Sequence, residues 1–250
     1  MSNQNNSQRL PLWWQVYDQE DHLGSLLKAI TESLLDEFEL ATNYYGLDDW
    51  RVYDKDPGKF QLNFFEQLEQ KLGFEGGDID AFRRALAISV ETYLKQHRIE
   101  AGEEEKQQLT EGLFAEFGGF GPLDPLLSDE DITDIIVHGP SRVYFRRGGR
   151  FEQAPLSFWS SQHLMWVIDR MFTPMALRVS EDEPMLTTRL PDGSRASAAV
   201  PPVSLVGPAL AIQTFRGERY TIDHLVEMDA LTEEMAEFIK ACIDSKLNIW

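Results

Sequence analysis

Residues 118–137 read GGFGPLDPLLSDEDITDIIV, and the hydrophobic pattern of the chain changes within this stretch. Before it, apolar residues recur every three or four positions, which is the spacing of one face of a helix. After it, β-branched residues gather in short runs between turn-forming residues, which is typical of strands. The stretch therefore separates a helical part that ends near Gly118 from a part that contains a sheet.

The part before Gly118 predicts a small helical bundle. One-sided apolar stripes indicate helices over residues 23–38, 79–97 and 109–117, and one-sided helices must pack on one another. Residues 63–72 predict a further short helix, because they begin with an asparagine that can cap it. We expect the last helix to end at Gly118-Gly119 through a glycine in the left-handed conformation.

The part after Phe120 predicts an antiparallel α+β sheet. Two hairpins are indicated, one around Gly148-Gly149 and one around the Pro-Asp-Gly-Ser turn of residues 191–194. Residues 164–171 predict a helix between these hairpins, and it should stop before Pro174. Strands paired by tight turns, with a helix between them, indicate an α+β fold. The expected strands are 134–137, 142–145, 151–154, 185–190, 195–200 and 209–215.

Two short helices, capped by Thr221 and Thr232, should follow the sheet, and the final residues LNIW begin an apolar strand that we expect to belong to a further domain. The expected organisation has four parts. They are an N-terminal extension with one amphipathic helix (1–60), a helical bundle (61–118), an antiparallel α+β domain (119–220), and linker helices with the start of the next domain (221–250).

The net charge of -19 over 250 residues argues against nucleic acid or anionic lipid as a partner of the whole surface. The basic residues change type along the chain. Ten of the twelve after Gly118 are arginine, whereas the eleven before it mix lysine and arginine about evenly. This bias favours either contacts with phosphate or buried ion pairs with carboxylates, and composition leaves both open.

No metal site or catalytic centre is expected in this sequence. Its five histidines lack paired ligand spacing, and no serine lies in a nucleophile-elbow context. The phosphate-binding pattern G-x-x-x-x-G-K-[ST] does not occur. With one cysteine and no apolar run of membrane-spanning length, the chain is expected to be cytoplasmic, without a transmembrane segment.

Five stretches, which lie between residues 119 and 249, match one family in order and spacing. They are GFGPLDPLLSDEDITDIIVHGPSRVYFRRGGRFE, HLMWVIDRMFTP, RVSEDEPM, TRLPDGSRASAAVPP and LTEEMAEFIKACIDSKLNI. They resemble the hexameric motor ATPases of type II and type IV secretion, and within these the tight-adherence (Flp pilus) assembly branch. The resemblance implies that the strand starting at Leu247 leads into the phosphate-binding loop of a RecA-like domain.

The resemblance also implies what this region does. It would be the N-terminal regulatory and assembly region of the ATPase, inactive alone and without a tightly bound cofactor. ATP and Mg²⁺ would be held by the RecA-like domain of the full-length protein. The implied partners are further copies in a homo-hexamer and inner-membrane platform proteins, so that the protein would be cytoplasmic and peripheral to the inner membrane.

The stretch RLPDGSR, residues 189–195, carries the candidate site. The resemblance implies that Arg195, with Arg189 behind it, contacts the nucleotide phosphates, and a guanidinium fork suits phosphate oxygens. The alternative is that both arginines pair with Asp192 or a sheet acid. The family usually has arginine where Gln213 stands in AIQTF, and Arg216 is expected to compensate. The last implied positions, Thr221 and Leu225, would serve as a base pocket or linker.

Two other functions stay open from the sequence. One is a stand-alone sensor-like module that binds a small molecule in its sheet, and the other is a scaffold whose acidic bundle docks a basic partner. The hairpin RVYFRRGGR carries four arginines in nine residues. It either docks an acidic neighbour or a lipid headgroup, or it is a solvated tip.

Overall fold

A computed structural model describes residues 12–18, 22–37, 78–215 and 221–247 of the chain. These residues form two compact units, 1–215 and 216–250, and each unit is described by itself. The helix predicted over residues 63–72, Arg216, and the predicted final strand beyond its first residue Leu247 lie outside the described residues.

The first unit begins with helices. They are the 3₁₀ helix η2 (Leu12–Tyr17) and the α-helices α1 (His22–Glu37), α4 (Ile79–His97) and α5 (Glu103–Gly118). The carboxylate of Asp78 caps α4 by accepting from the backbone N–H of Ala81 at 2.9 Å. Three glutamates in the first turn of α5 suit the positive end of the helix dipole. The predicted helical stripes within the described residues are confirmed.

The end of α5 lies at Gly118, as predicted, but the reason given for it is wrong. Gly119 has a φ of -119°, so it is not left-handed. The carboxylate of Asp124 accepts from the Phe120 N–H at 2.9 Å, and a Cβ on Gly119 would lie 1.8 Å from that carboxylate. Gly119 is therefore required for space, and the left-handed residue is Gly121, with a φ of 55°.

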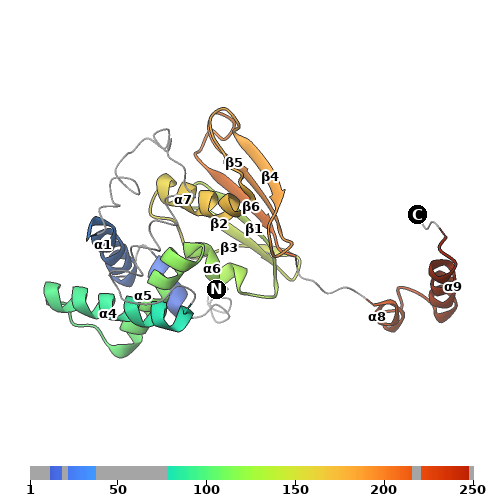
Figure 1. The fold of residues 1–250 in the computed structure, drawn as a ribbon, viewed down its shortest axis with the longest axis horizontal. Coiled ribbons are helices and arrows are strands. Elements are labelled where there is room, and N and C mark those ends of the chain that lie inside the picture. Colours follow the sequence, from blue (N-terminus) through green and yellow to red (C-terminus); the bar gives the residue numbers. More distant parts are fainter. Residues whose placement is uncertain (1–11, 19–21, 38–77, 216–220, 248–250) are drawn as a thin grey trace, which may run out of the picture. The chain divides into compact units, whose positions relative to one another are not determined.

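The second half of the unit is an antiparallel sheet of six strands in the order β3-β2-β1-β6-β5-β4 (Figure 1). Gly148 and Gly149 turn the β2–β3 hairpin with φ values of 54° and 80°, as predicted. The antiparallel α+β fold is confirmed. The strands are β1 (Ile132–His138), β2 (Val143–Arg147), β3 (Arg150–Gln153), β4 (Met185–Arg189), β5 (Arg195–Ala199) and β6 (Ala209–Gln213).

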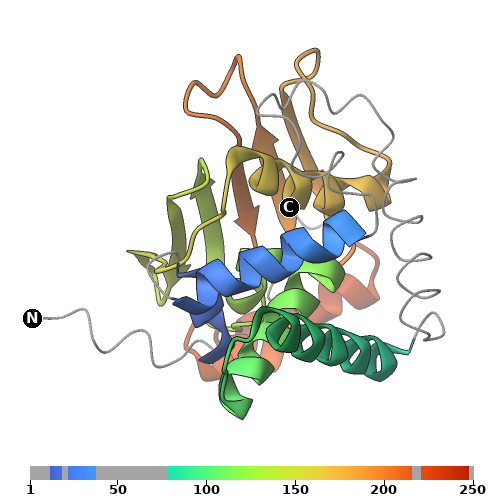
Figure 2. The same cartoon turned by 90° about the vertical axis from the view of Figure 1, so that its left-hand side faces the viewer.

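Helix α7 (Ser161–Phe172) lies along one face of the sheet, and α1, α4 and α5 lie on the same side of it (Figures 1 and 2). The strands alternate accordingly. In one row across the sheet, Ala196, Ile212, Ile135 and Phe145 are all buried. The next row faces the other way and is mostly exposed, so the sheet has one covered face and one open face.

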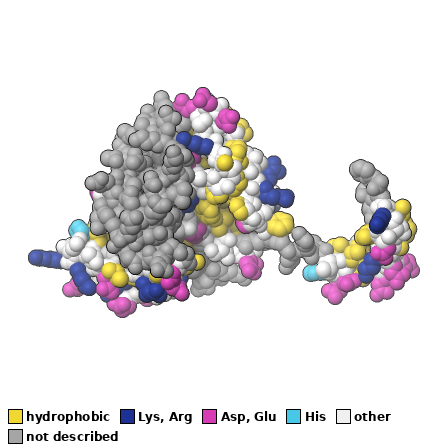
Figure 3. Space-filling view, in the orientation of Figure 1, with side chains coloured by type: hydrophobic (Ala, Val, Ile, Leu, Met, Phe, Trp, Pro, Cys, Tyr) yellow, Lys and Arg dark blue, Asp and Glu magenta, His cyan; other side chains and the backbone are white. Residues whose placement is uncertain are grey.

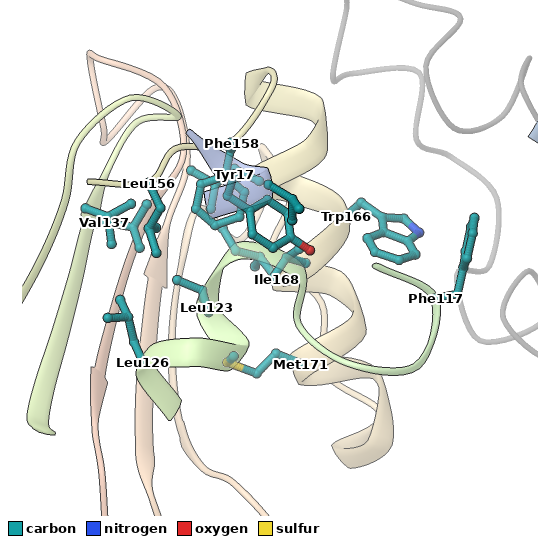
Figure 4. Close-up of a cluster of buried hydrophobic side chains, with 14 of the residues drawn as sticks. Tyr17, Phe117, Leu123, Leu126, Val137, Leu156, Phe158, Trp166, Ile168 and Met171 are labelled. Atoms are coloured by element: carbon teal, nitrogen blue, oxygen red, sulfur yellow. The ribbon is translucent and has the colours of Figure 1, made fainter. Parts of the chain in front are cut away.

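Helices and sheet share one hydrophobic core (Figure 4). Tyr17 of η2, Val137 of β1 and Ile168 of α7 point into the same cluster. Leu123 of η4 (Gly121–Leu123) and Leu126 of α6 (Asp124–Leu127) fill the space between them. The change of secondary structure near residue 118 thus lies inside one compact unit, and the finer division at 60, 118 and 220 stays a prediction.

The second unit contains α8 (Ile222–Glu227) and α9 (Glu233–Asp244). The hydroxyls of Thr221 and Thr232 cap them, as predicted, by accepting from backbone N–H groups at 3.1 and 3.2 Å. Within the parts of both units that the structure describes, no helix is long and apolar enough to cross a membrane.

Candidate functional site

Six side chains lie in one row across the open face of the sheet, one from each strand. Pairing of the strands puts Arg189 opposite Arg195, Arg195 opposite Gln213, and Gln213 opposite Asp134. The row continues through Arg146 to Phe151 at the far edge. We call these six residues the arginine row. Neighbouring strands are about 4.8 Å apart, so Arg189 and Arg195 are direct neighbours.

The two arginines at the β4–β5 end of the row are exposed and have no acid beside them. Among the described residues neither guanidinium forms an ion pair. The alternative partner named from the sequence, Asp192, accepts instead from the backbone N–H and the hydroxyl of Ser194, at 3.0 and 2.8 Å. Two like charges directly opposite each other in a sheet repel, so this pair lowers the stability of the strand pairing rather than adding to it.

The other end of the row is neutralised. The guanidinium of Arg146 lies 3.2 Å from the carboxylate of Asp134 and 4.7 Å from the centre of the Phe151 ring. Gln213 stands between Asp134 and Arg195, so an uncharged side chain separates the acid from the free arginine. Figure 3 shows basic side chains gathered beside exposed hydrophobic ones on the side where β4 forms the sheet edge.

Of the other sequence-predicted positions, Gln213 lies opposite Arg195 in the arginine row. The rest fall elsewhere. Thr221 and Leu225 belong to the second unit, where Thr221 is the cap of α8 and Leu225 is half-buried within it. Arg216 lies outside the described residues.

The four arginines of the β2–β3 hairpin are not one solvated cluster. Arg147 is 8% exposed and pairs with Asp129, and Arg146 belongs to the arginine row. Only Arg142 and Arg150 are exposed at the surface. Half of the hairpin's arginines are therefore structural.

Sequence reasoning missed three acids near α7, of which Glu116 and Asp169 are buried and Asp124 is half-buried. Glu116 and His163 are fully buried and joined by a 3.0 Å contact between Oε2 and Nε2. Burial raises the pKa of Asp169 to about 7, and Arg178 opposes this shift. Burial likewise raises the pKa of Asp124 to about 6, against the hydrogen bond from Phe120 and the charge of Arg170. No local pattern marks these residues, because their environment is made by segments that are distant in sequence.

These acids do not form a metal site. In the described ranges, no group of three or more histidine, cysteine, aspartate or glutamate side chains is arranged to hold a metal ion. Of the positions predicted from the sequence, the arginine row brings together Arg189, Arg195 and Gln213.

The model of one protein family, described as type II/IV secretion system protein, matches residues 116–249 of the chain. The chain belongs to this family. The matched segment starts near the end of α5 and includes the whole sheet, the arginine row and both helices of the second unit.

Relatives of this type II/IV secretion family member include proteins of conjugal transfer. A probable conjugal transfer protein TrbB of Sinorhizobium fredii is 27% identical over 124 residues, which are 49% of this chain and 38% of that protein. A putative conjugal transfer protein of Mycobacterium tuberculosis is 23% identical over 141 residues, 54% of this chain and 40% of that protein. The chain thus spans about two fifths of the length of these curated relatives.

Among solved structures, the VirB11 ATPase from the Brucella suis type IV secretion system, in complex with sulphate, is similar with a TM-score of 0.40 and 22% identity. The similarity covers 50% of this chain and 42% of that one.

Proposed function

We propose that this chain is the N-terminal regulatory and assembly region of a hexameric ATPase that drives secretion or pilus assembly, nearest to the tight-adherence branch. In this proposal the α+β part, residues 119–220, presents Arg195 and Arg189 to the phosphates of ATP. The observation that carries it is the pair of exposed, unneutralised arginines in register on the open face of the sheet. The match to the type II/IV secretion family supports a role in a secretion machine.

The residues present fit the phosphate end of a nucleotide. The neighbouring positions on the open face are small, with Thr187 opposite Ser197 in the adjacent row, so a phosphate can approach both guanidinium groups. The fit does not extend to Mg²⁺, because the nearest acid of the row, Asp134, is held by Arg146. We therefore assign the metal and the rest of the ATP site to a RecA-like domain of the longer protein.

Bound ATP would supply a γ-phosphate whose cleavage removes negative charge at the arginines. What the chain's own residues do is hold two cations on a rigid β-hairpin at the end of a packed sheet. A contact of this kind is strong while the phosphate is present and is lost after hydrolysis, so that the chemical step can become a rigid-body movement. The hexamer, the cytoplasmic location at the inner membrane and the platform-protein partners belong to this same proposal.

The test is ATP turnover by the full-length protein with Arg195→Ala. We expect kcat to fall by about tenfold or more, because a phosphate-directed arginine can contribute orders of magnitude in rate. Arg189→Ala should have a weaker effect in the same direction. Arg150→Ala is the matched control, because it removes an exposed arginine from the same sheet but from outside the arginine row.

The stability of the 250-residue chain should hardly change in Arg195→Ala, since an exposed charge contributes about 1 kcal/mol at most. An early-melting variant whose full-length turnover is normal would make Arg195 a structural residue and end the phosphate assignment.

A further inference from the structure

The turn that precedes Arg195 is fastened to the end of β6. Ser194 is 2% exposed, and its hydroxyl accepts from the backbone N–H of Phe215 at 2.9 Å. The same hydroxyl donates to the carboxylate of Asp192, whose other oxygen accepts from the Ser194 N–H. We call this turn, residues 191–194, the arginine turn. The buried Ser194 thus links the arginine turn to Phe215, 21 positions later.

Packing reinforces this link. The Phe215 ring lies against Gly193, where an added Cβ would come within 2.9 Å of its Cδ1 atom. Gly193 also has a φ of 90°, a conformation that side-chain-bearing residues rarely adopt. The glycine is therefore required both by the turn and by the aromatic ring that covers it.

Phe215 occupies a particular place in the chain, because it is the last residue of the first unit and Arg216 begins the second. Its neighbour Thr214 is held as well. The Thr214 N–H donates to the Thr133 carbonyl at 2.9 Å, and the Thr214 hydroxyl donates to the Ile132 carbonyl at 2.7 Å. The chain leaves the sheet from a point fixed to both β1 and the arginine turn.

We propose that Gly193, Ser194 and Phe215 form a latch that positions Arg195 and ties it to Phe215, the last residue of the first unit. This inference rests on the proposed function, in which Arg195 meets phosphate. Arg195 follows Ser194 directly, and its opposite residue Gln213 lies two positions before Phe215. A displacement of Phe215 therefore acts on Arg195 from both sides, and a shift of about 1 Å at a catalytic contact costs rate. Ser194 is then a positioning residue.

The first test follows the latch itself, by limited trypsin digestion of the 250-residue chain. Trypsin must bind the residues next to the bond it cleaves, so cleavage after Arg216 requires Phe215 to leave the turn. Cleavage after Arg219 does not, because Phe215 lies four residues before Arg219. The ratio of the two initial rates, measured by mass spectrometry, reports opening of the latch within one molecule. In Ser194→Ala we expect cleavage after Arg216 to rise about fivefold relative to Arg219, the effect of one ordinary hydrogen bond.

Two variants control this experiment. Ser194→Thr keeps the hydroxyl and should restore the ratio. Ser197→Ala removes a hydroxyl from the same strand, where it bonds to Thr187 at 2.9 Å, and should leave the ratio unchanged. Thermal unfolding of each variant shows whether a change comes from the latch or from global unfolding. A ratio that does not move in a folded Ser194→Ala overturns the latch.

The second test follows the effect on Arg195, by ATP turnover of the full-length protein. Ser194→Ala should lower kcat several-fold with little change in KM, and Ser194→Thr should recover it. If Ser194 acts through Arg195, the double variant Ser194→Ala/Arg195→Ala should be no slower than Arg195→Ala alone.

The outcomes separate the two proposals. A normal rate in Arg195→Ala defeats the phosphate function and, with it, the positioning role. A slow Arg195→Ala combined with a normal Ser194→Ala leaves the function standing and overturns the latch. Additive losses in the double variant would also overturn it, because Ser194 would then act independently of Arg195.

Discussion

One buried residue, Asp169, departs from the ordinary chemistry of its type. Asp169 is 3% exposed, and neither of its carboxylate oxygens has a hydrogen-bond partner among the described residues. Its pKa is raised to about 7 because burial disfavours the charged form. Well below pH 4 the proton is bound in folded and unfolded chains alike, and between about pH 4 and about pH 7 only the folded chain keeps it, because ionisation there would bury a charge.

The free energy of unfolding should therefore fall as pH rises from about 4 to about 7 and level off above that, and Asp169→Asn should remove most of this dependence. At pH 8 we expect the variant to melt several degrees above the wild type, and at about pH 4 the two should be similar. Thermal unfolding at both values measures this. Asp182→Asn, which changes an exposed carboxylate, is the control. If Asp169→Asn keeps the pH dependence of the wild type, that dependence must come from another group, for instance Asp124.

Gln213 gives a second prediction at this scale. It lies between Asp134 and Arg195, so Gln213→Arg places a third guanidinium beside Arg195 and restores the residue usual in the family. Asp134 is already held by Arg146, which leaves the new charge available to phosphate. We expect higher ATP affinity or turnover in the full-length protein. Gln153→Arg adds the same charge to the same face of the sheet at β3 and should leave ATP affinity and turnover unchanged. An equal increase in both variants would show that the effect comes from net charge and not from the position beside Arg195.

At the scale of elements, α5 and α7 are joined by the buried pair of Glu116 and His163. The backbone N–H of Trp159 donates to Nδ1 of His163 at 3.2 Å, so Nε2 carries the proton that is donated to Glu116. Arg170 of α7 also donates to the Glu116 and Gly119 carbonyls at the end of α5. These contacts join α5 to α7, the helix that lies along the covered face of the sheet.

Removing one partner should cost far more than removing both. His163→Leu leaves a buried, unpaired carboxylate, and we expect a loss of about 3–5 kcal/mol in the free energy of unfolding, measured with urea. Glu116→Met combined with His163→Leu should recover more than half of that loss. Lys95→Ala, which breaks an exposed pair with Glu91, should leave the urea midpoint nearly unchanged. A double variant as unstable as His163→Leu would show that the pair is favourable in itself.

Some features of these elements could be predicted from the sequence, and others could not. The turns at Gly148-Gly149 and at residues 191–194 were predictable because glycine and proline restrict the local backbone in recognisable ways. The opposition of Arg189 and Arg195 follows from the second turn. The neighbours of Gln213 and the bond from Phe215 to Ser194 did not follow, because the β5–β6 register is set by packing over a long connection. Ile79 fits the apolar stripe of α4 yet is 61% exposed, since it lies in the first turn, beyond the packed face.

At the scale of the whole molecule, the shared core suggests which pieces can fold alone. The sheet and α7 bury side chains that reach them from η2 and α5, so residues 119–215 alone would expose much of that core. We expect residues 1–215 to unfold cooperatively with nearly the melting temperature of the full chain. Residues 119–215 should lose cooperative unfolding. A cooperative transition in the shorter piece, followed by circular dichroism, would instead support an independent α+β domain that starts near residue 119.

The division of labour proposed for the longer protein leads to a last prediction, that this 250-residue chain hydrolyses no ATP by itself. Two cations on a sheet can stabilise phosphate charge, but they cannot cradle a triphosphate or orient the attacking water. The sequence has no phosphate-binding loop, and the acid of the arginine row is occupied by Arg146. Phosphate release should match the buffer blank at every protein concentration. The Arg195→Ala chain is the control, because a contaminating ATPase would give both proteins the same rate. Turnover that persists through repurification, tracks the folded protein on heating and disappears in Arg195→Ala would show that the arginine row catalyses hydrolysis without a partner domain.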